Sequence, residues 1–152
     1  MYTARRSEIM YPLAGDFADA HGAGANASAW VNVRDYHRLW LVVNVGEMQA
    51  TSTLDAVLQQ ATTTGGAGGK AILAKNQVTN KAITQLTAAG GDSDSLVCIE
   101  LQTEELDVSN GFDCVRFVVT VALAVTEYSV ELYGCEPRHM AVPTTNWTEI
   151  ID

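Results

Sequence analysis

The chain has 152 residues, a length typical of one domain that buries roughly two-thirds of its unfolded surface. Apolar residues make up 47% of it, which argues against disorder throughout, while charged residues make up only 18%. The net charge is −9, and residues 92–152 hold two basic and twelve acidic side chains, a local charge of −10. A general nucleic-acid binder needs a basic surface that releases phosphate counterions, so this composition argues against direct nucleic-acid binding.

The cysteines and the N-terminus indicate the compartment. Cys98, Cys114 and Cys135 are an odd number without a CxxC spacing. Cys98 and Cys114 lie in predicted strands, where a free thiol behaves as a small buried apolar group. We therefore expect no disulfide framework, in keeping with a reducing cytoplasm. The N-terminal residues lack the apolar core of a signal peptide, and no apolar run approaches the roughly 18 residues of a membrane span, so we expect neither secretion nor membrane insertion.

Residues 1–28 show no hydrophobic periodicity, and the stretch ADAHGAGANASA consists of small and polar residues that cannot fill a core. We therefore expect an extended arm ahead of the folded domain. Its apolar side chains, among them Tyr2, Ile9 and Tyr11, indicate that part of the arm docks on its own domain or on a neighbouring subunit.

The first predicted strands are Trp30–Val33 and Leu39–Val45. The second, LWLVVNV, is apolar on both faces, as in a central strand covered on both sides or a strand at an interface, and Trp40 is assigned to the core. Residues Thr51–Thr64 fit a helical stripe and a strand equally well, and their threonine content favours a strand.

The TTTGGAGGK stretch is glycine-rich like a phosphate-binding loop, but the motif fails twice. Thr64 stands at the position of its first glycine, and Ala71 follows the lysine where a magnesium-binding Ser or Thr is required. We predict a hairpin or contact loop here, followed by weak strands at Ala71–Ala74 and Ala82–Leu86.

The stretch from Leu96 to Gly134 gives the strongest strand signal. Its apolar residues alternate with polar ones in Leu96–Leu101, Phe112–Leu123 and Tyr128–Tyr133, which is typical of a sheet with one buried face. The inward sets are predicted to be Val97, Ile99 and Leu101; then Val115, Phe117, Val119, Val121 and Leu123; then Tyr128, Val130 and Leu132. The Asn110-Gly111 pair ahead of the second segment supplies residues that tolerate positive φ in a tight turn.

These segments predict an all-β protein: a single β-sandwich or jelly roll of about eight short antiparallel strands. The domain is expected at residues 29–135, between an extended N-terminal arm (1–28) and an extended C-terminal tail (136–152) that carries Trp147.

No constellation in the sequence predicts a reaction, a cofactor or a metal site. Asp16, Asp19 and His21 are ligand-type residues, but they lack an EF-hand or HExxH spacing. The acidic residues Glu104, Glu105 and Asp107 are interpreted as a solvated turn. The sequence also lacks the GxSxG context of a serine nucleophile, so we expect a protein that is not an enzyme.

Several strings, taken in order, resemble a family of small tailed-bacteriophage proteins from the virion structural gene cluster. They are Leu58-Gln59-Gln60-Ala61-Thr62, Ile83-Thr84-Gln85-Leu86-Thr87, Glu104-Glu105-Leu106-Asp107-Val108, Asn110-Gly111-Phe112 with Val115-Arg116, and Gly134-Cys135-Glu136-Pro137-Arg138. The resemblance covers roughly Trp30 to Arg138, and its motifs are turn and strand sequences, not catalytic signatures.

This resemblance implies a capsid decoration (cement) protein, made in the host cytoplasm and bound to the outer capsid surface. The implied partner is the major capsid protein, whose neighbouring copies it would bridge, with a homotrimer as the favoured oligomer. Partner contacts are expected in the two terminal segments, at Tyr2, Arg5, Arg6, Ile9, Tyr11 and Trp147.

Two other functions stay open at this stage. One is a head–tail connector or tail component, which would assemble as a ring or tube. The other is a carbohydrate-binding β-sandwich for host attachment. A sugar site needs exposed aromatic residues, and the only tryptophans are Trp30, Trp147 and Trp40, the last of which is assigned to the core.

Overall fold

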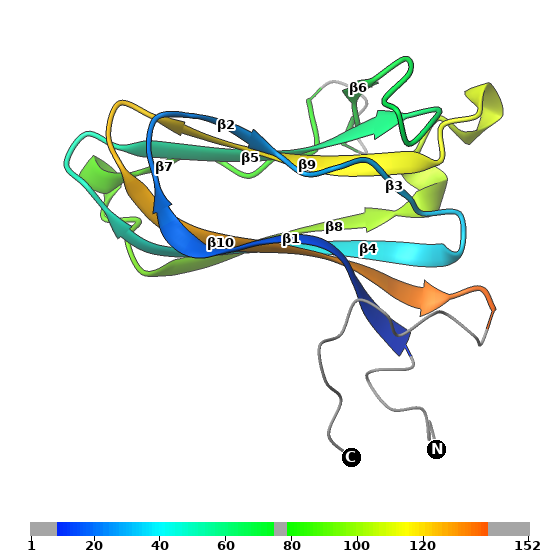
Figure 1. The fold of residues 1–152 in the computed structure, drawn as a ribbon, viewed down its shortest axis with the longest axis horizontal. Helices are drawn as coiled ribbons and strands as arrows, with labels where there is room; N and C mark the ends of the chain where they lie inside the picture. Colours follow the sequence, from blue (N-terminus) through cyan, green and yellow to red (C-terminus); the bar gives the residue numbers. More distant parts are fainter. Residues whose placement is uncertain (1–8, 75–78, 140–152) are drawn as a thin grey trace.

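The computed structural model describes residues 9–74 and 79–139, which form two antiparallel β-sheets stacked face to face (Figure 1). The four-stranded sheet has the spatial order β1 (Met10–His21), β10 (Thr126–Pro137), β4 (Tyr36–Met48) and β8 (Ser95–Gln102).

The second sheet has six strands. Its order is β2 (Gly24–Ala27), β9 (Cys114–Ala122), β5 (Thr53–Ala61) and β6 (Lys70–Ala71), with β3 (Val31–Asn32) also on β9 and β7 (Leu86–Thr87) also on β5. The named helices are single 3₁₀ turns, η1 (Ala88–Gly90), η2 (Thr103–Glu105) and η3 (Val108–Asn110). Within the described residues, no helix is long and apolar enough to cross a membrane.

The strands pair like one long hairpin rolled up on itself. β1 pairs with β10, β2 and β3 pair with β9, β4 pairs with β8, and β5 pairs with β6 and β7. The first strand thus lies beside the last, and the pairing proceeds inward along the chain. This connectivity is that of a jelly roll, so the expected fold class is confirmed.

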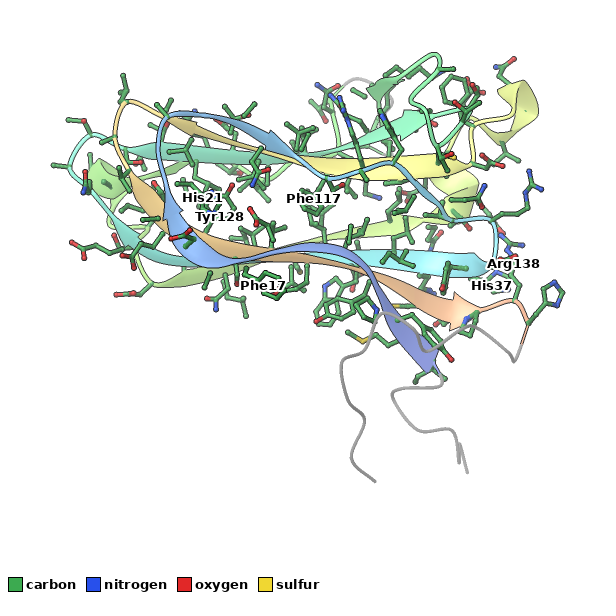
Figure 2. All side chains as sticks on the ribbon, in the orientation of Figure 1. Phe17, His21, His37, Phe117, Tyr128 and Arg138 are labelled. Carbon is green, nitrogen blue, oxygen red and sulfur yellow. The ribbon has the colours of Figure 1, made fainter. Side chains whose placement is uncertain are left out.

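The hydrophobic core lies between the two sheets, where Figure 2 shows Phe117 and Tyr128. Both side chains are almost fully buried, at 1% and 2% exposure. The core forms because alternate residues of each strand point to the same face, so two apolar faces can be closed against each other. Its other main members are Leu39, Leu41, Val43, Leu54, Leu58, Ile99, Leu101, Val119, Val121, Val130 and Leu132.

The alternation predicted for the C-terminal half is confirmed, with one exception. Leu101, Val130 and Leu132 are buried, and the ambiguous segment Thr51–Thr64 contains the strand β5. Leu123 was expected on the buried face, but its side chain is 76% exposed. The strand ends one residue earlier, and Leu123 has a φ of 71° in the turn that leads to β10. A left-handed backbone angle takes the residue out of the pleat and reverses where its side chain points.

Residues 10–27 form two strands of the sandwich, where the sequence analysis expected an arm. β1 pairs with β10 and β2 pairs with β9, so the sandwich begins at Met10 and not at residue 29. Small residues suffice because β1 and β2 lie at sheet edges, where backbone hydrogen bonds and one partly buried face hold a strand. At the other end, β10 continues to Pro137, two residues beyond the expected domain boundary.

Candidate interaction surface

The four-stranded sheet has an outer face that turns away from the second sheet. Along β4, the outward side chains Trp40, Val42 and Asn44 alternate with buried ones. The register places Tyr133 and Glu100 on either side of Trp40, and Glu131 and Cys98 on either side of Val42. An antiparallel face in contact with water is normally polar. This face instead carries a run of apolar and aromatic side chains.

The apolar character extends across the sheet to both of its edges. Leu96 of β8 is 70% exposed, and Phe17 of β1 is 92% exposed on the outer side of the sheet (Figure 2). We call the set Phe17, Trp40, Val42, Leu96, Cys98 and Tyr133 the apolar outer face. Single exposed apolar residues are common on soluble proteins, but several on one sheet face are typical of an interaction surface.

Trp40 lies at the centre of this face, although the sequence analysis assigned it to the core. Its ring contacts Tyr133 with 6.5 Å between the ring centroids. The indole Nε1 is buried and has no hydrogen-bond acceptor among the described residues. A buried polar group without a partner costs free energy, so this donor is an unfavourable feature of the isolated subunit.

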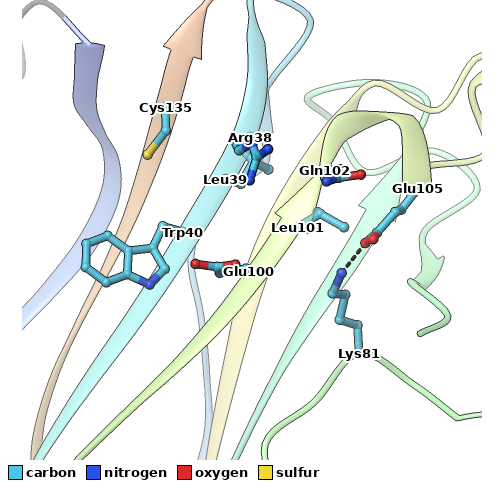
Figure 3. A pocket seen from close by; sticks show the side chains of 9 residues that line it. All are labelled: Arg38, Leu39, Trp40, Lys81, Glu100, Leu101, Gln102, Glu105 and Cys135. Atoms are coloured by element: carbon cyan, nitrogen blue, oxygen red, sulfur yellow. Dashed lines mark hydrogen bonds and ion pairs between the residues drawn. The ribbon is translucent and has the colours of Figure 1, made fainter. Parts of the chain in front are cut away.

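A groove of about 370 Å³ runs from Trp40 across β4 and β8 (Figure 3). Its polar side chains are Arg38, Glu100 and Gln102, and the Lys81–Glu105 ion pair lies at its end beyond β8. Arg38 is held by an ion pair to Glu136, with 3.1 Å between Nε and Oε2. The groove therefore combines an aromatic wall with fixed charges of both signs.

Burial and neighbouring charges shift three titratable groups on this side of the sheet. Burial raises the pKa of the Glu131 carboxyl. Burial, reinforced by the nearby Glu131, raises the pKa of Tyr133. Burial, followed by the charges of Glu136 and Glu100, raises the pKa of the Cys135 thiol. Each shift is in the direction that favours the neutral form, because burial penalises the charged form of these side chains.

A second groove, of about 320 Å³, lies beside the 3₁₀ turn η3 and is lined by Val108 and Phe112. An ion pair between Arg34 and Asp113, at 2.6 Å, lies at its wall. Next to it, burial and the Asp113 carboxylate raise the pKa of Cys114 to about 11. A thiol with this pKa is protonated at neutral pH and is a poor nucleophile or metal ligand.

His21 and Asp16, two of the three ligand-type residues of the N-terminal segment, join a polar cluster between the sheets. The His21 ring stacks on Tyr128 at 4.0 Å, and its Nε2 lies 3.5 Å from an Asp16 oxygen. Asn26 donates to Asp16 and to the Tyr128 hydroxyl, the latter at 3.2 Å. These contacts link β1, β2 and β10, and no group of three metal ligands occurs among residues 9–74 and 79–139.

Two acidic residues after β8 form ion pairs with lysines. Glu105 pairs with Lys81, and Asp107 pairs with Lys70 at 2.5 Å. The hydrogen bond from Lys70, followed by one from Asn110, lowers the pKa of Asp107. These ion pairs fix the loops around η2 and η3. The predicted tight turn at Asn110-Gly111 is found at the end of η3, with Gly111 at a φ of 80°.

Four of the six predicted partner residues, Tyr2, Arg5, Arg6 and Trp147, lie outside the described residues. Ile9 is half-buried at the start of the described chain. Tyr11 is only 7% exposed and packs on Tyr36, with 6.3 Å between ring centroids. Tyr11 therefore contributes to the core of its own subunit and offers little surface to another.

The outer face was not predicted, although the sequence contains a signal for it. In LWLVVNV, the polar Asn44 shares its face with Trp40 and Val42, which marks that face as the outward one. Cys98 follows from the same alternation: it is exposed, and only Cys114 of the two strand thiols is buried as expected.

No protein-family model matches the sequence, and no curated protein is significantly similar to it. Several solved structures have a similar arrangement of strands. A chain of the empty capsid of Triatoma virus matches with a TM-score of 0.42 and 9% identity, over 78% of this chain and 87% of the viral one. A Cocksfoot mottle virus chain matches with a TM-score of 0.39 and 12% identity, over 91% and 97%.

The mitogen derived from Yersinia pseudotuberculosis matches with a TM-score of 0.39 and 13% identity, over 93% of this chain and 96% of its own. The matches thus include chains from two viruses and a mitogen. Similarity at this level does not assign a function, which has to be argued from the surface itself.

Proposed function

We propose that this protein is a non-enzymatic structural protein of a tailed-phage virion, which decorates and stabilises the capsid by bridging neighbouring major capsid proteins. The observation that carries the proposal is the apolar outer face, in which Phe17, Trp40 and Leu96 extend across one sheet. The resemblance of the turn and strand motifs to phage virion proteins supports the choice of partner.

The rigidity of the sandwich favours binding through its outer face. A jelly roll with a closed core presents its outer face without rearranging, so little conformational entropy is lost on binding. Many copies that each bind only the assembled shell stabilise that shell by mass action. The acidic excess of residues 92–152 would make decorated particles repel one another and stay dispersed.

In this proposal the protein is made in the host cytoplasm and resides on the outer surface of the capsid as a homo-oligomer, with a trimer favoured. The decisive experiment adds purified protein to expanded capsids that lack it and counts the bound copies by cryo-EM. A copy number comparable to the local three-fold positions is expected. A copy number of about a dozen, with density in a ring at the portal vertex, would instead identify a connector.

The role of the apolar outer face is tested by Trp40→Ala, with Leu123→Ala as the matched control. Leu123 is an exposed apolar residue in the β9–β10 turn, away from this face. We expect Trp40→Ala to weaken capsid binding about tenfold or more, as for a central interface aromatic, and Leu123→Ala to leave it unchanged. Equal affinity of both variants would remove the outer face from the proposal.

The contribution of the N-terminal residues is tested separately. Removing residues 1–8 deletes Tyr2, Arg5 and Arg6 but leaves every strand of both sheets in place. We expect a folded protein with weaker capsid binding, and Trp147→Ala is expected to act in the same direction. Full binding by both variants would assign the capsid contact to the sandwich alone.

A carbohydrate-binding protein is the second candidate, because the Trp40–Tyr133 pair borders a groove with polar side chains. Sugars stack on aromatic rings while their hydroxyls bond to nearby charged and amide groups. A glycan array read with wild type and Trp40→Ala separates the two functions. Hits that Trp40→Ala abolishes, together with a lack of capsid binding, would favour the carbohydrate-binding function.

A further inference from the structure

The two edges of the four-stranded sheet differ in how well they are protected against pairing with another strand. β1 contains Pro12 and has two register shifts against β10, between Pro12 and Ala14 and between Asp16 and Asp19. Prolines and bulges are the usual means by which an exposed edge avoids pairing. The edge formed by β1 is therefore a poor template for a further strand.

β8 has none of these protections. Its eight residues, SLVCIELQ, contain no proline or glycine, and they pair with β4 without a shift from Arg38↔Gln102 to Val45↔Ser95. Only β4 pairs with β8 among the described strands, and within the described residues the backbone of Leu96–Gln102 forms no hydrogen bond outside that ladder. The outward backbone groups of a straight strand are thus available to another strand.

We propose that β8 pairs antiparallel with β8 of a second copy across a two-fold axis, so that the two four-stranded sheets become one continuous sheet. In such a pair, one residue faces its own symmetry mate, and its neighbours are paired reciprocally. This contact does not depend on the proposed capsid function, and it is compatible with a trimer, since a two-fold contact can join neighbouring trimers.

The side chains of β8 restrict the register. Pairing centred on Glu100 would place two carboxylates face to face, which is unfavourable. Pairing centred on Cys98 places Glu100 opposite Leu96 of the second copy and avoids any contact between like charges. It also places Asp94 of the second copy opposite Gln102, at the end of β8 where Lys81 lies, which is a favourable arrangement of charge.

The Cys98 register makes a direct prediction for thiol cross-linking. Cα atoms of directly opposed residues in an antiparallel pair are about 4.5–5.5 Å apart, so the two exposed Cys98 thiols would lie within reach of each other. A short bis-maleimide is expected to give a dimer whose cross-linked peptide joins Cys98 to Cys98. Cys98→Ser should abolish this product, and Cys135→Ser should not.

Charge substitutions at Leu96 test the same register without a thiol. Leu96→Glu would face Glu100 of the second copy at two symmetric positions, and Leu96→Lys would face it with opposite charge. We expect Leu96→Glu to weaken the dimer about tenfold in sedimentation equilibrium, and Leu96→Lys to leave it unchanged or tighter. Asn44→Glu, on the same face one strand inward, is the matched control and should have no effect.

Three results would overturn the proposal: a wild-type protein that forms no Cys98–Cys98 cross-link, dimers cross-linked only through Cys135, or equal weakening by Leu96→Glu and Leu96→Lys. If Leu96→Glu fails to fold, as judged by thermal unfolding, the cross-linking of wild-type protein still decides. The cross-linking and sedimentation of the wild-type protein are measured without capsids, which separates a failure of this contact from a failure of the proposed function.

Discussion

The two faces of the four-stranded sheet both carry apolar side chains, yet these side chains differ in exposure. Along β4, Leu39, Leu41 and Val43 are 1%, 0% and 0% exposed, whereas Trp40 and Val42 between them are only half-buried. The inner face is closed by the second sheet, and the outer face is not covered by it. Apolar residues on a strand thus have two uses, one for folding and one for contact with another molecule.

This difference separates the residues that stabilise the fold from those of the proposed contact surface. The inner face contributes the favourable free energy of burying apolar area. The outer side chains add little to the free energy of unfolding because much of their surface stays in water. A change on one face should therefore affect mainly stability, and a change on the other mainly binding.

The largest effect is expected for Leu41→Ala compared with Val42→Ala. Leu41 is fully buried, so its truncation removes transfer free energy and leaves a cavity, and we expect a loss of about 2–5 kcal/mol. Val42 on the outer face should lose less than about 1 kcal/mol on the same scale. Chemical denaturation measures both, and equal losses would contradict the assignment of the two faces.

A smaller loss is expected for Gly134→Ala, which adds a methyl group to the buried side of β10. A Cβ at this position would lie 2.6 Å from Cδ1 of Tyr36, whose ring is 5% exposed and cannot move away freely. We expect a loss of about 1–3 kcal/mol from overpacking, measured by thermal unfolding. Gly22→Ala is the control, because a Cβ at Gly22 would meet no atom within 4 Å. A stable Gly134→Ala variant would show that this part of the core is loosely packed.

The buried thiol of Cys114 is expected to make the free energy of unfolding depend on pH. Burial raises the pKa of Cys114 from 9.0 to about 11, so between these values the unfolded thiol ionises while the folded thiol stays protonated. The folded state then binds more protons, and the free energy of unfolding falls as pH rises, by up to 1.4 kcal/mol, roughly, per pH unit.

Denaturation of wild type and Cys114→Ala at pH 8 and at about pH 10.5 measures this term. Because burial also raises the pKa of Tyr36 and Tyr128, the wild type loses stability from those groups as well, and the difference between the two proteins isolates Cys114. Exposed Cys98 should react with a thiol reagent at pH 8 while Cys114 does not. Equal pH dependence of both proteins would contradict the burial of this thiol.

The smallest effect is expected for Phe17→Ser. The Phe17 side chain is 92% exposed, so its removal should change the free energy of unfolding by no more than about 0.5 kcal/mol. The same variant should reduce capsid binding if the outer face is the contact surface. A marked loss of stability would mean that Phe17 is covered by another part of the chain, and that the outer face is smaller than described.

Much of the fold was predictable because alternation is a local property. The buried faces of β8, β9 and β10 followed from the spacing of Ile99, Phe117 and Val130, and the strand β5 from its threonines. The strands at the N-terminus were not predictable, since Ala, Gly and Asp carry no periodic signal. β1 forms because β10 offers it free backbone groups, and β10 is more than a hundred residues away in the sequence. β2 forms in the same way on β9, which is about ninety residues away.

The candidate surface was less predictable than the fold. The sequence placed Trp40 in a strand but could not say which face the second sheet would cover. Tyr11 shows the opposite case, because an aromatic residue in an unpatterned segment proved to be part of the core. Partner residues cannot be assigned from hydrophobicity alone, because hydrophobicity gives the tendency of a residue to be buried and not the identity of what buries it.

The all-β sandwich, the inward positions of its main strands and the acidic character of its C-terminal half follow from the sequence alone. These features depend on the two-residue period of a strand and on composition, which local residues fix. In contrast, the three-dimensional structure was needed to show that residues 10–27 belong to the sheets, that Trp40 and Cys98 face outward, and that β8 is an unprotected edge. Strand order and the choice of the covered face result from pairing between segments that are far apart in the sequence. Neither segment alone therefore predicts them.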